Sequence, residues 1–90
     1  MNNKVLVKLF VPEIDSSFDV FIPVNEVVWK INKMLIKSVS GLSNANIDLK
    51  SEYTLLNKIT TRIYNNNEII IETDIRNGTE LILISNNTNK

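Results

Sequence analysis

The period of the hydrophobic pattern changes once, early in the chain, and this change limits the possible folds more than any other feature. Residues 4–10 and 18–22 place apolar side chains at alternate positions, as half-buried strands do. Pro12 and Pro23 close these two runs, because proline cannot donate to a strand ladder. After Pro23 the apolar residues recur every three or four positions, which is the period of a helix. The pattern therefore predicts a β-hairpin followed by one amphipathic helix.

The expected helix has clear signals at both ends. Asn25 is the predicted N-cap, and Gly41 is the predicted C′ residue that ends the helix in left-handed geometry. The apolar stripe between them is made by six residues: Val24, Val28, Ile31, Leu35, Val39 and Leu42.

Shorter segments follow the helix. The sequence predicts a third strand at residues 53–57, a short fourth strand at 62–64 and a last, β-branched strand at 80–84. Residues 69–75 are apolar but lead straight into a turn in which Gly78 should supply a positive φ. Residues 43–52 fit either a loop or a single helical turn.

This order of elements predicts an α+β fold with a mixed sheet of four to five strands and one main helix packed across one face. The last strand can lie parallel to the first in the centre of the sheet, which is the β-grasp arrangement. Ninety residues make a single domain. We expect an ordered core at about residues 4–85 and a polar tail at 86–90.

The composition argues against several functions. Ten basic and ten acidic residues give a net charge of zero, whereas nucleic-acid modules usually carry a basic excess. The chain has no Cys and no His, which removes thiolate metal sites, iron–sulfur clusters and the commonest general base. We expect neither catalysis nor a metal or cofactor. No signal peptide or membrane span is recognisable, so direct membrane insertion is not expected and the predicted location is the cytoplasm.

The closing segment, ETDIRNGTELILI at residues 72–84, resembles the I-x-x-G-x-x-L-x-L ending of ubiquitin-like domains. Within that superfamily the chain is most similar to the YukD/EsaB family of bacterial type VII secretion accessory proteins. Residues 17–39 also fit, with an F-D-hydrophobic strand, a proline and then a helix. The resemblance implies a non-catalytic, cytoplasmic adaptor of a WXG100/ESX-like system. It implies partners among the membrane components or the FtsK/SpoIIIE-type ATPase.

Two alternatives remain beside the adaptor. Some β-grasp proteins are small effector subunits of multicomponent enzymes. A ubiquitin-like modifier or sulfur carrier would need a terminal Gly-Gly, but this sequence ends SNNTNK. YukD-like proteins resemble ubiquitin in fold and likewise lack that ending.

Two pairs of carboxylates are close in sequence, Asp15 with Asp19 and Glu72 with Asp74. Such pairs can bind a hard cation or exchange protons. No histidine or glycine-rich loop accompanies them, so we interpret them as solvated turn residues.

The strongest candidate site is the face of the sheet turned away from the helix. If Val7, Leu9 and Leu81 face the helix, alternation turns another apolar set outward. With the first and last strands adjacent, Leu6 is expected near Ile82 and Ile84. Contiguous apolar side chains in water usually mark an interaction site. The predicted protein-binding residues are Leu6, Phe21, Ile82 and Ile84, with Phe10 on the same face.

Two further arrangements would also account for an apolar face here: the chain itself covers it, or it forms the seam of a homodimer. Whether Leu55 or Leu56 joins the face depends on the strand register, which the pattern leaves open.

A second candidate lies on the helix. Trp29, Lys33 and Ile36 fall off the apolar stripe and form a possible exposed binding ridge. In the alternative, Trp29 covers the edge of the sheet as part of the core.

Overall fold

A computed structural model describes residues 3–43, 47 and 49–86 of the chain. It contains four strands, one α-helix and two short 3-10 helices. In chain order they are β1 (Lys4–Val11), η1 (Pro12–Ile14), β2 (Ser16–Pro23), α1 (Val28–Ser43), β3 (Tyr53–Asn57), η2 (Ile70–Glu72) and β4 (Glu80–Ser85).

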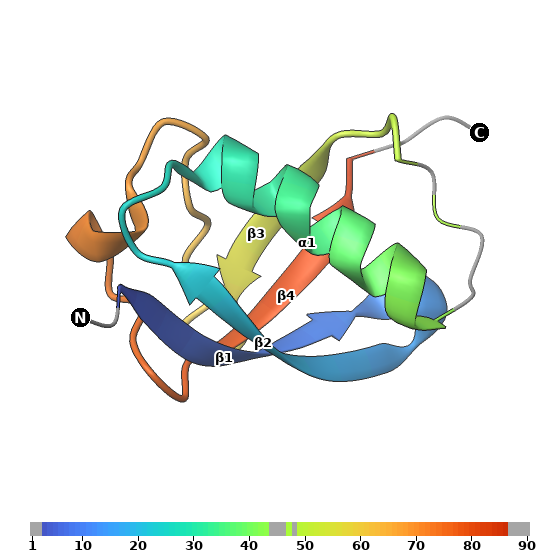
Figure 1. Cartoon of the computed structure of the whole chain (residues 1–90), viewed down its shortest axis with the longest axis horizontal. Coiled ribbons are helices and arrows are strands. Elements are labelled where there is room, and N and C mark those ends of the chain that lie inside the picture. The colour runs from blue at the N-terminus through green and yellow to red at the C-terminus, as the bar shows by residue number, and fades with distance from the viewer. Residues whose placement is uncertain (1–2, 44–46, 48, 87–90) are drawn as a thin grey trace.

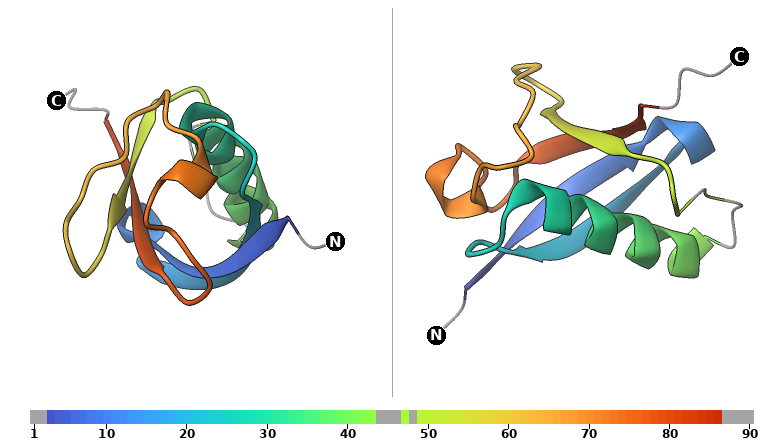
Figure 2. Two further views of the ribbon diagram at one scale, coloured as in Figure 1. Left: turned by 90° about the vertical axis from the view of Figure 1, so that its left-hand side faces the viewer. Right: turned by 90° about the horizontal axis from the view of Figure 1, so that it is seen from above.

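The four strands form one mixed sheet in the order β2-β1-β4-β3. Strand β1 pairs antiparallel with β2 and parallel with β4, and β4 pairs antiparallel with β3. Helix α1 lies across one face of this sheet (Figures 1 and 2). The predicted α+β, β-grasp arrangement is confirmed, including the last strand in parallel beside the first.

The core lies between α1 and the sheet. Four residues of the predicted helical stripe are fully buried there: Val28, Ile31, Leu35 and Val39. The two ends of the stripe were predicted wrongly. Val24 precedes the helix and is only partly buried, and Leu42 is 66% exposed. Among the described residues, no helix has the length and apolar character needed to cross a membrane.

The start of the helix differs from the prediction because of hydrogen bonds to a distant segment. Asn25 is not the N-cap, since α1 begins at Val28. The N–H groups of Val28 and Trp29 donate to the carbonyls of Glu68 and Asn66, at 2.8 and 3.1 Å. These tertiary bonds satisfy N–H groups that a capping side chain would otherwise serve. The segment carrying η2 therefore lies beside the first turn of α1 (Figures 1 and 2).

The end of the helix was also predicted wrongly. Gly41 lies within α1 and has no positive φ, because the helix continues to Ser43. Residues 44–46 and 48 fall outside the described part of the chain. In the rest of the segment whose conformation the sequence left open, Ile47 is buried and Leu49 is exposed.

The predicted fourth strand at residues 62–64 is replaced by an isolated bridge between Ile63 and Leu56. In the apolar run at 69–75 the chain forms η2, which buries Ile70 and exposes Ile71. Gly78 has a φ of 89°, as predicted. Its N–H donates to the Leu6 carbonyl at 2.8 Å, so this turn aligns the start of β4 with β1.

The two glycines of the chain should respond oppositely to alanine. A Cβ at either position meets no other atom within 4 Å, so only backbone conformation matters. Gly41→Ala should stabilise the fold by up to about 1 kcal/mol, because alanine favours the helix. Gly78→Ala should cost about 1–2 kcal/mol, because its positive φ strains an L-residue. Urea unfolding of both variants measures the difference; equal effects would contradict the assigned helix end.

Candidate functional site

The sheet has a covered face and an open face, and the predicted division between them is confirmed by burial. Val7, Leu9 and Leu81, which were predicted to face the helix, are buried. The residues that share their face of the sheet are likewise buried in the core or packed against it: Val5, Phe18, Val20, Ile22 and Leu83. Their neighbours along each strand turn outward, and Leu6, Phe21 and Ile84 are exposed. Leu55 is buried, whereas Leu56 is half-buried and belongs to the open face. The register left open by the sequence is thereby settled.

The predicted grouping on the open face is wrong in one respect. In the parallel pairing of β1 with β4, the residue opposite Ile82 is Phe10, not Leu6. Leu6 lies further back along β1, where its N–H donates to Asn77 Oδ1 at 2.8 Å and its cross-strand partner is Phe21. The expected patch therefore divides into two, with Leu6 and Phe21 in one part and Ile82 in the other.

A row of alternating charges separates these two parts. Four side chains follow one another across the sheet from β2 to the end of β3: Asp19, Lys8, Glu80 and Lys58. Lys8 Nζ lies 3.6 Å from Asp19 Oδ1, and Lys58 Nζ lies 3.7 Å from Glu80 Oε1. Lys58 Nζ also lies 5.9 Å from the centre of the Phe10 ring. The row thus forms a polar border to the apolar residues beyond it.

Beyond this border, cross-strand pairing brings apolar residues into one line. Phe10 lies opposite Ile82, Ile82 opposite Leu56, and Leu56 is bridged to Ile63. Ile84 is two positions along β4 on the same face. We call these five residues the apolar cluster. Phe10, Leu56 and Ile82 are half-buried, and Ile63 and Ile84 are exposed. The sequence left Leu56 open, because its face depends on the register, and it missed Ile63, which the structure joins to the cluster through the bridge to Leu56.

The exposed ridge predicted at Trp29, Lys33 and Ile36 is wrong, because the structure has a groove there. Trp29 is 42% exposed and Lys33 is exposed, but Ile36 is 3% exposed and cannot form a ridge. These three residues line a hollow of about 290 Å³ between α1 and the segment leading into β3. Leu49 and Tyr53 line it from that segment. Ile36 is therefore part of the core with one side toward the groove.

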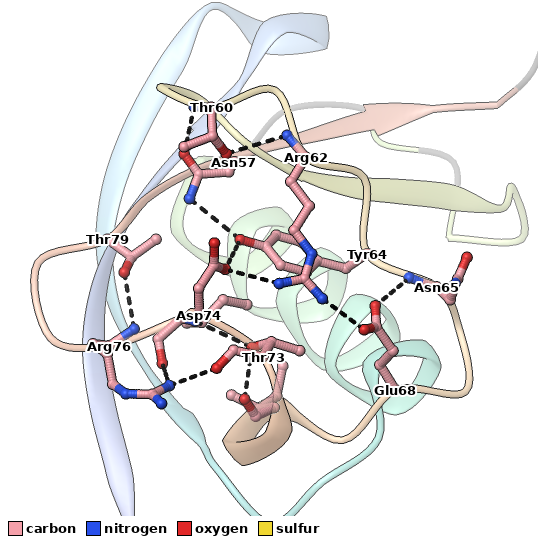
Figure 3. A network of polar contacts seen from close by, with 12 residues as sticks. Asn57, Thr60, Arg62, Tyr64, Asn65, Glu68, Thr73, Asp74, Arg76 and Thr79 are labelled. Carbon is pink, nitrogen blue, oxygen red and sulfur yellow. Dashed lines mark hydrogen bonds and ion pairs between the residues drawn. The ribbon is translucent and has the colours of Figure 1, made fainter.

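The loop between β3 and β4 carries a polar network around the buried Tyr64 (Figure 3). The Tyr64 hydroxyl donates to Asp74 Oδ1 at 2.6 Å and accepts from Asn57 Nδ2 at 3.2 Å. Arg62 donates to Glu68 Oε2 at 2.7 Å, and its guanidinium stacks 4.9 Å from the Tyr64 ring. The network joins residues at both ends of the loop and holds the loop against β3.

In each pair of carboxylates considered as a cation site, one member is engaged by a neighbouring side chain. Asp74 is engaged by Tyr64 and, at 3.6 Å, by Arg62, while Asp19 is paired with Lys8. Within the described ranges, no three Asp, Glu, His or Cys residues come together as metal ligands would. Asp15 closes η1 in left-handed geometry, with a φ of 52°.

The Tyr64 network should make stability depend on pH in the alkaline range. Burial, followed by the hydrogen bond to Asp74, raises the pKa of Tyr64 from 10.0 to about 12. The neutral phenol therefore stabilises the fold fully below pH 10, and this contribution is lost as the pH rises toward 12. The loss should be on the order of 2 kcal/mol.

Tyr64→Phe should flatten this alkaline dependence in denaturant unfolding measured from pH 9 to pH 12. The chain has two tyrosines, so ultraviolet titration of Tyr53→Phe observes Tyr64 alone. An ionisation near pH 10 in that folded variant would contradict the network as described.

No protein-family model matches the chain, and no curated protein sequence matches it. Solved structures resemble it in fold. A chain of the toluene 4-monooxygenase HD complex with the inhibitor 4-bromobenzoate has a TM-score of 0.74 and 8% identity, over 91% of this chain and 98% of that one. The EccD5 ubiquitin-like domain from Mycobacterium xenopi has a TM-score of 0.68 and 14% identity, over 93% and 96%. The protein has a ubiquitin-like β-grasp fold.

A third structure places the same fold within a larger chain. In the MycP5-free ESX-5 inner membrane complex, one chain matches with a TM-score of 0.70 and 15% identity. The match covers 99% of this protein but only 22% of that chain, so this protein spans about a fifth of its length. At such identities the likeness establishes the fold alone.

Proposed function

We propose that this protein is a non-catalytic, ubiquitin-like adaptor that binds a protein partner through the apolar cluster. The observation that carries the proposal is the line Phe10, Ile82, Leu56 and Ile63 on the face that α1 leaves uncovered. Contiguous apolar side chains rimmed by polar groups are typical of protein-binding surfaces. The charged row supplies that rim on one side, so a partner can seat an apolar segment in one orientation.

The fold supports a particular setting for this adaptor. We propose a cytoplasmic accessory component of a type VII, ESX-like secretion system, related to the YukD/EsaB family. The support is the resemblance of residues 17–39 and 72–84 to that family, together with the fold shared with the EccD5 domain and an ESX-5 membrane-complex chain. The proposed partners are a membrane component or the FtsK/SpoIIIE-type ATPase, which would hold the adaptor at the membrane surface.

A second candidate is a small effector subunit of a multicomponent enzyme. The observation in its favour is the likeness to a chain of the toluene 4-monooxygenase complex, which spans almost all of both chains. Identification of the captured partner separates the two functions: secretion components support the adaptor, and oxygenase subunits support the effector.

Ile82→Glu should abolish partner binding without unfolding the protein. Ile82 is central in the cluster, so a carboxylate there would be desolvated by the partner, and the loss should be about 2 kcal/mol or more. The fold should lose only about 0.2–1 kcal/mol, the contribution of a cross-strand pair. Crosslinked capture from host membranes measures binding, and urea unfolding measures the fold. Leu42→Glu, exposed at the end of α1, is the matched control and should bind normally.

Phe21→Glu tests the other part of the open face. Phe21 is 59% exposed and lies beyond the charged row from the apolar cluster. If Phe21→Glu loses the partner and Ile82→Glu keeps it, the assigned cluster is wrong. If the wild type crosslinks only to itself and Ile82→Glu does not, the cluster is a homodimer seam and the adaptor function fails.

A further inference from the structure

Strand β2 forms one edge of the sheet, and part of its backbone points away from the sheet. In β1, Leu6 and Lys8 direct their N–H and C=O groups toward β4, where they bond to residues 77–79. The residues opposite them in β2 are Phe21 and Asp19. In an antiparallel pair, opposite residues either exchange both backbone hydrogen bonds or direct both sets of groups outward. Phe21 and Asp19 therefore present their N–H and C=O groups at the free edge.

Alternation along the strand adds Ser17, so three residues of β2 present backbone groups at this edge. Ser17, Asp19 and Phe21 are all exposed, and within the described ranges no hydrogen bond reaches these groups. The strand also lacks most features that protect a free edge. It pairs with β1 without a bulge, it contains no Lys, and its proline, Pro23, is its last residue. Such an edge is a template for pairing with another strand.

The opposite edge of the sheet, at β3, is closed by the protein itself. The Tyr53 carbonyl accepts from Asn32 Nδ2 at 3.0 Å. Leu55 and Asn57 form backbone hydrogen bonds to the segment 62–64, at 3.0 and 2.9 Å. Pairing with a further strand is therefore open to β2 and not to β3.

The residues of β2 select one register for pairing with the same edge of a second copy about a twofold axis. All three outward residues lie opposite the second β2 in only two registers, centred on Asp19 or on Val20, because any further shift carries one of them past an end of the strand. Centring on Asp19 places two carboxylates opposite each other, which is destabilising. Centring on Val20 lets Asp19 and Phe21 of the second copy exchange both backbone hydrogen bonds, while the Ser17 N–H donates to the Pro23 carbonyl.

The register centred on Val20 also covers apolar side chains that β2 leaves open. Phe21 is 59% exposed, and it would lie diagonally across the axis from Phe21 of the second copy. Diagonal neighbours are about 7–8 Å apart, which is within reach of aromatic side chains. On the helix side of the sheet, Phe18 and Val20 are only partly buried, and the added strand would cover their open side.

We propose that the protein forms a twofold homodimer through its β2 edges, with Val20 opposite Val20 of the second copy and one continuous sheet across both copies. Opposite residues of paired strands share a face, so both helices lie on one side of this sheet and both apolar clusters on the other. The dimer does not depend on the adaptor function. Where that function holds, the dimer presents two binding sites to one partner surface, and an assembly of repeated subunits binds it more tightly through the second contact.

Single cysteines test the register, because the chain has no cysteine of its own. In Val20→Cys the two thiols belong to a non-hydrogen-bonded pair with Cα atoms about 4.5 Å apart, a separation that a disulfide spans. Mild oxidation should therefore trap a covalent dimer. Phe18→Cys, on the same face of β2, is the matched control and should not be trapped, since its two cysteines would lie about 13 Å apart along the strands. Trapping of Asp19→Cys instead would overturn the register, and trapping of neither Val20→Cys nor Asp19→Cys would overturn the dimer.

Sedimentation velocity over a dilution series tests the edge itself. The wild type should be a dimer that dissociates on dilution. Asp19→Pro removes an N–H that makes no bond within the fold, so it should remain folded in urea unfolding and dimerise at least about tenfold more weakly. Asp19→Asn keeps that N–H and is the matched control, which should dimerise like the wild type. If Asp19→Pro fails to fold, the cysteine variants still decide the proposal.

Ile82→Glu separates the dimer from the adaptor function. This variant should lose the captured partner and still dimerise, because Ile82 lies in the apolar cluster and not at the β2 edge. A dimer lost in Ile82→Glu and kept in Asp19→Pro would overturn the edge proposal, as would a wild type that is monomeric at every concentration. A monomeric Asp19→Pro that still captures the partner would support both the edge dimer and a separate binding face.

Discussion

The parallel pairing of β1 with β4 is the contact on which the rest of the structure depends. It joins the first and last strands in the centre of the sheet, and three pairs define it, Lys8 with Glu80, Leu9 with Leu81 and Phe10 with Ile82. The middle pair is fully buried beneath α1, while the outer two face solvent. One register therefore completes the core and, on the opposite face, places the charged row and the apolar cluster.

This pairing requires the chain to return from β3 to the start of β4 through the loop at residues 58–79, which has little regular structure. The loop is held at three places instead. Tyr64 is buried against Asn57 and Asp74, the carbonyls of residues 66 and 68 accept from the first turn of α1, and the turn at Gly78 bonds to Leu6. A loop fixed in this way caps the first turn of α1 and aligns β4 with β1. Its contacts take the place of a fifth strand.

Hydrophobic period predicts which face a side chain occupies, but it does not predict register. Shifting β4 along β1 by an even number of residues leaves every buried residue buried, so the pattern of residues 80–84 is equally consistent with Leu6 or Phe10 beside Ile82. The faces of Leu81 and Ile82 were therefore predictable and their neighbours were not. The N-cap signal failed at Asn25, because backbone hydrogen bonds to residues 66 and 68 serve the first turn of α1 instead. The predicted helix end at Gly41 failed because α1 continues to Ser43.

The position of the charged row bears on the proposed adaptor function more than its contribution to stability does. Both ion pairs in it are exposed, and such pairs contribute at most about 1 kcal/mol each. Its position is more informative, because it crosses the whole open face between two groups of apolar side chains. Alternating charges at that place oppose the continuous apolar surface that would favour nonspecific association, and they favour a partner whose charges match the row. Lys58 belongs to the charged row through its pair with Glu80, and it also contacts the apolar cluster through the Phe10 ring. In the proposed adaptor this border would restrict how a partner approaches the apolar cluster, so selectivity and apolar contact would depend on the same strand register.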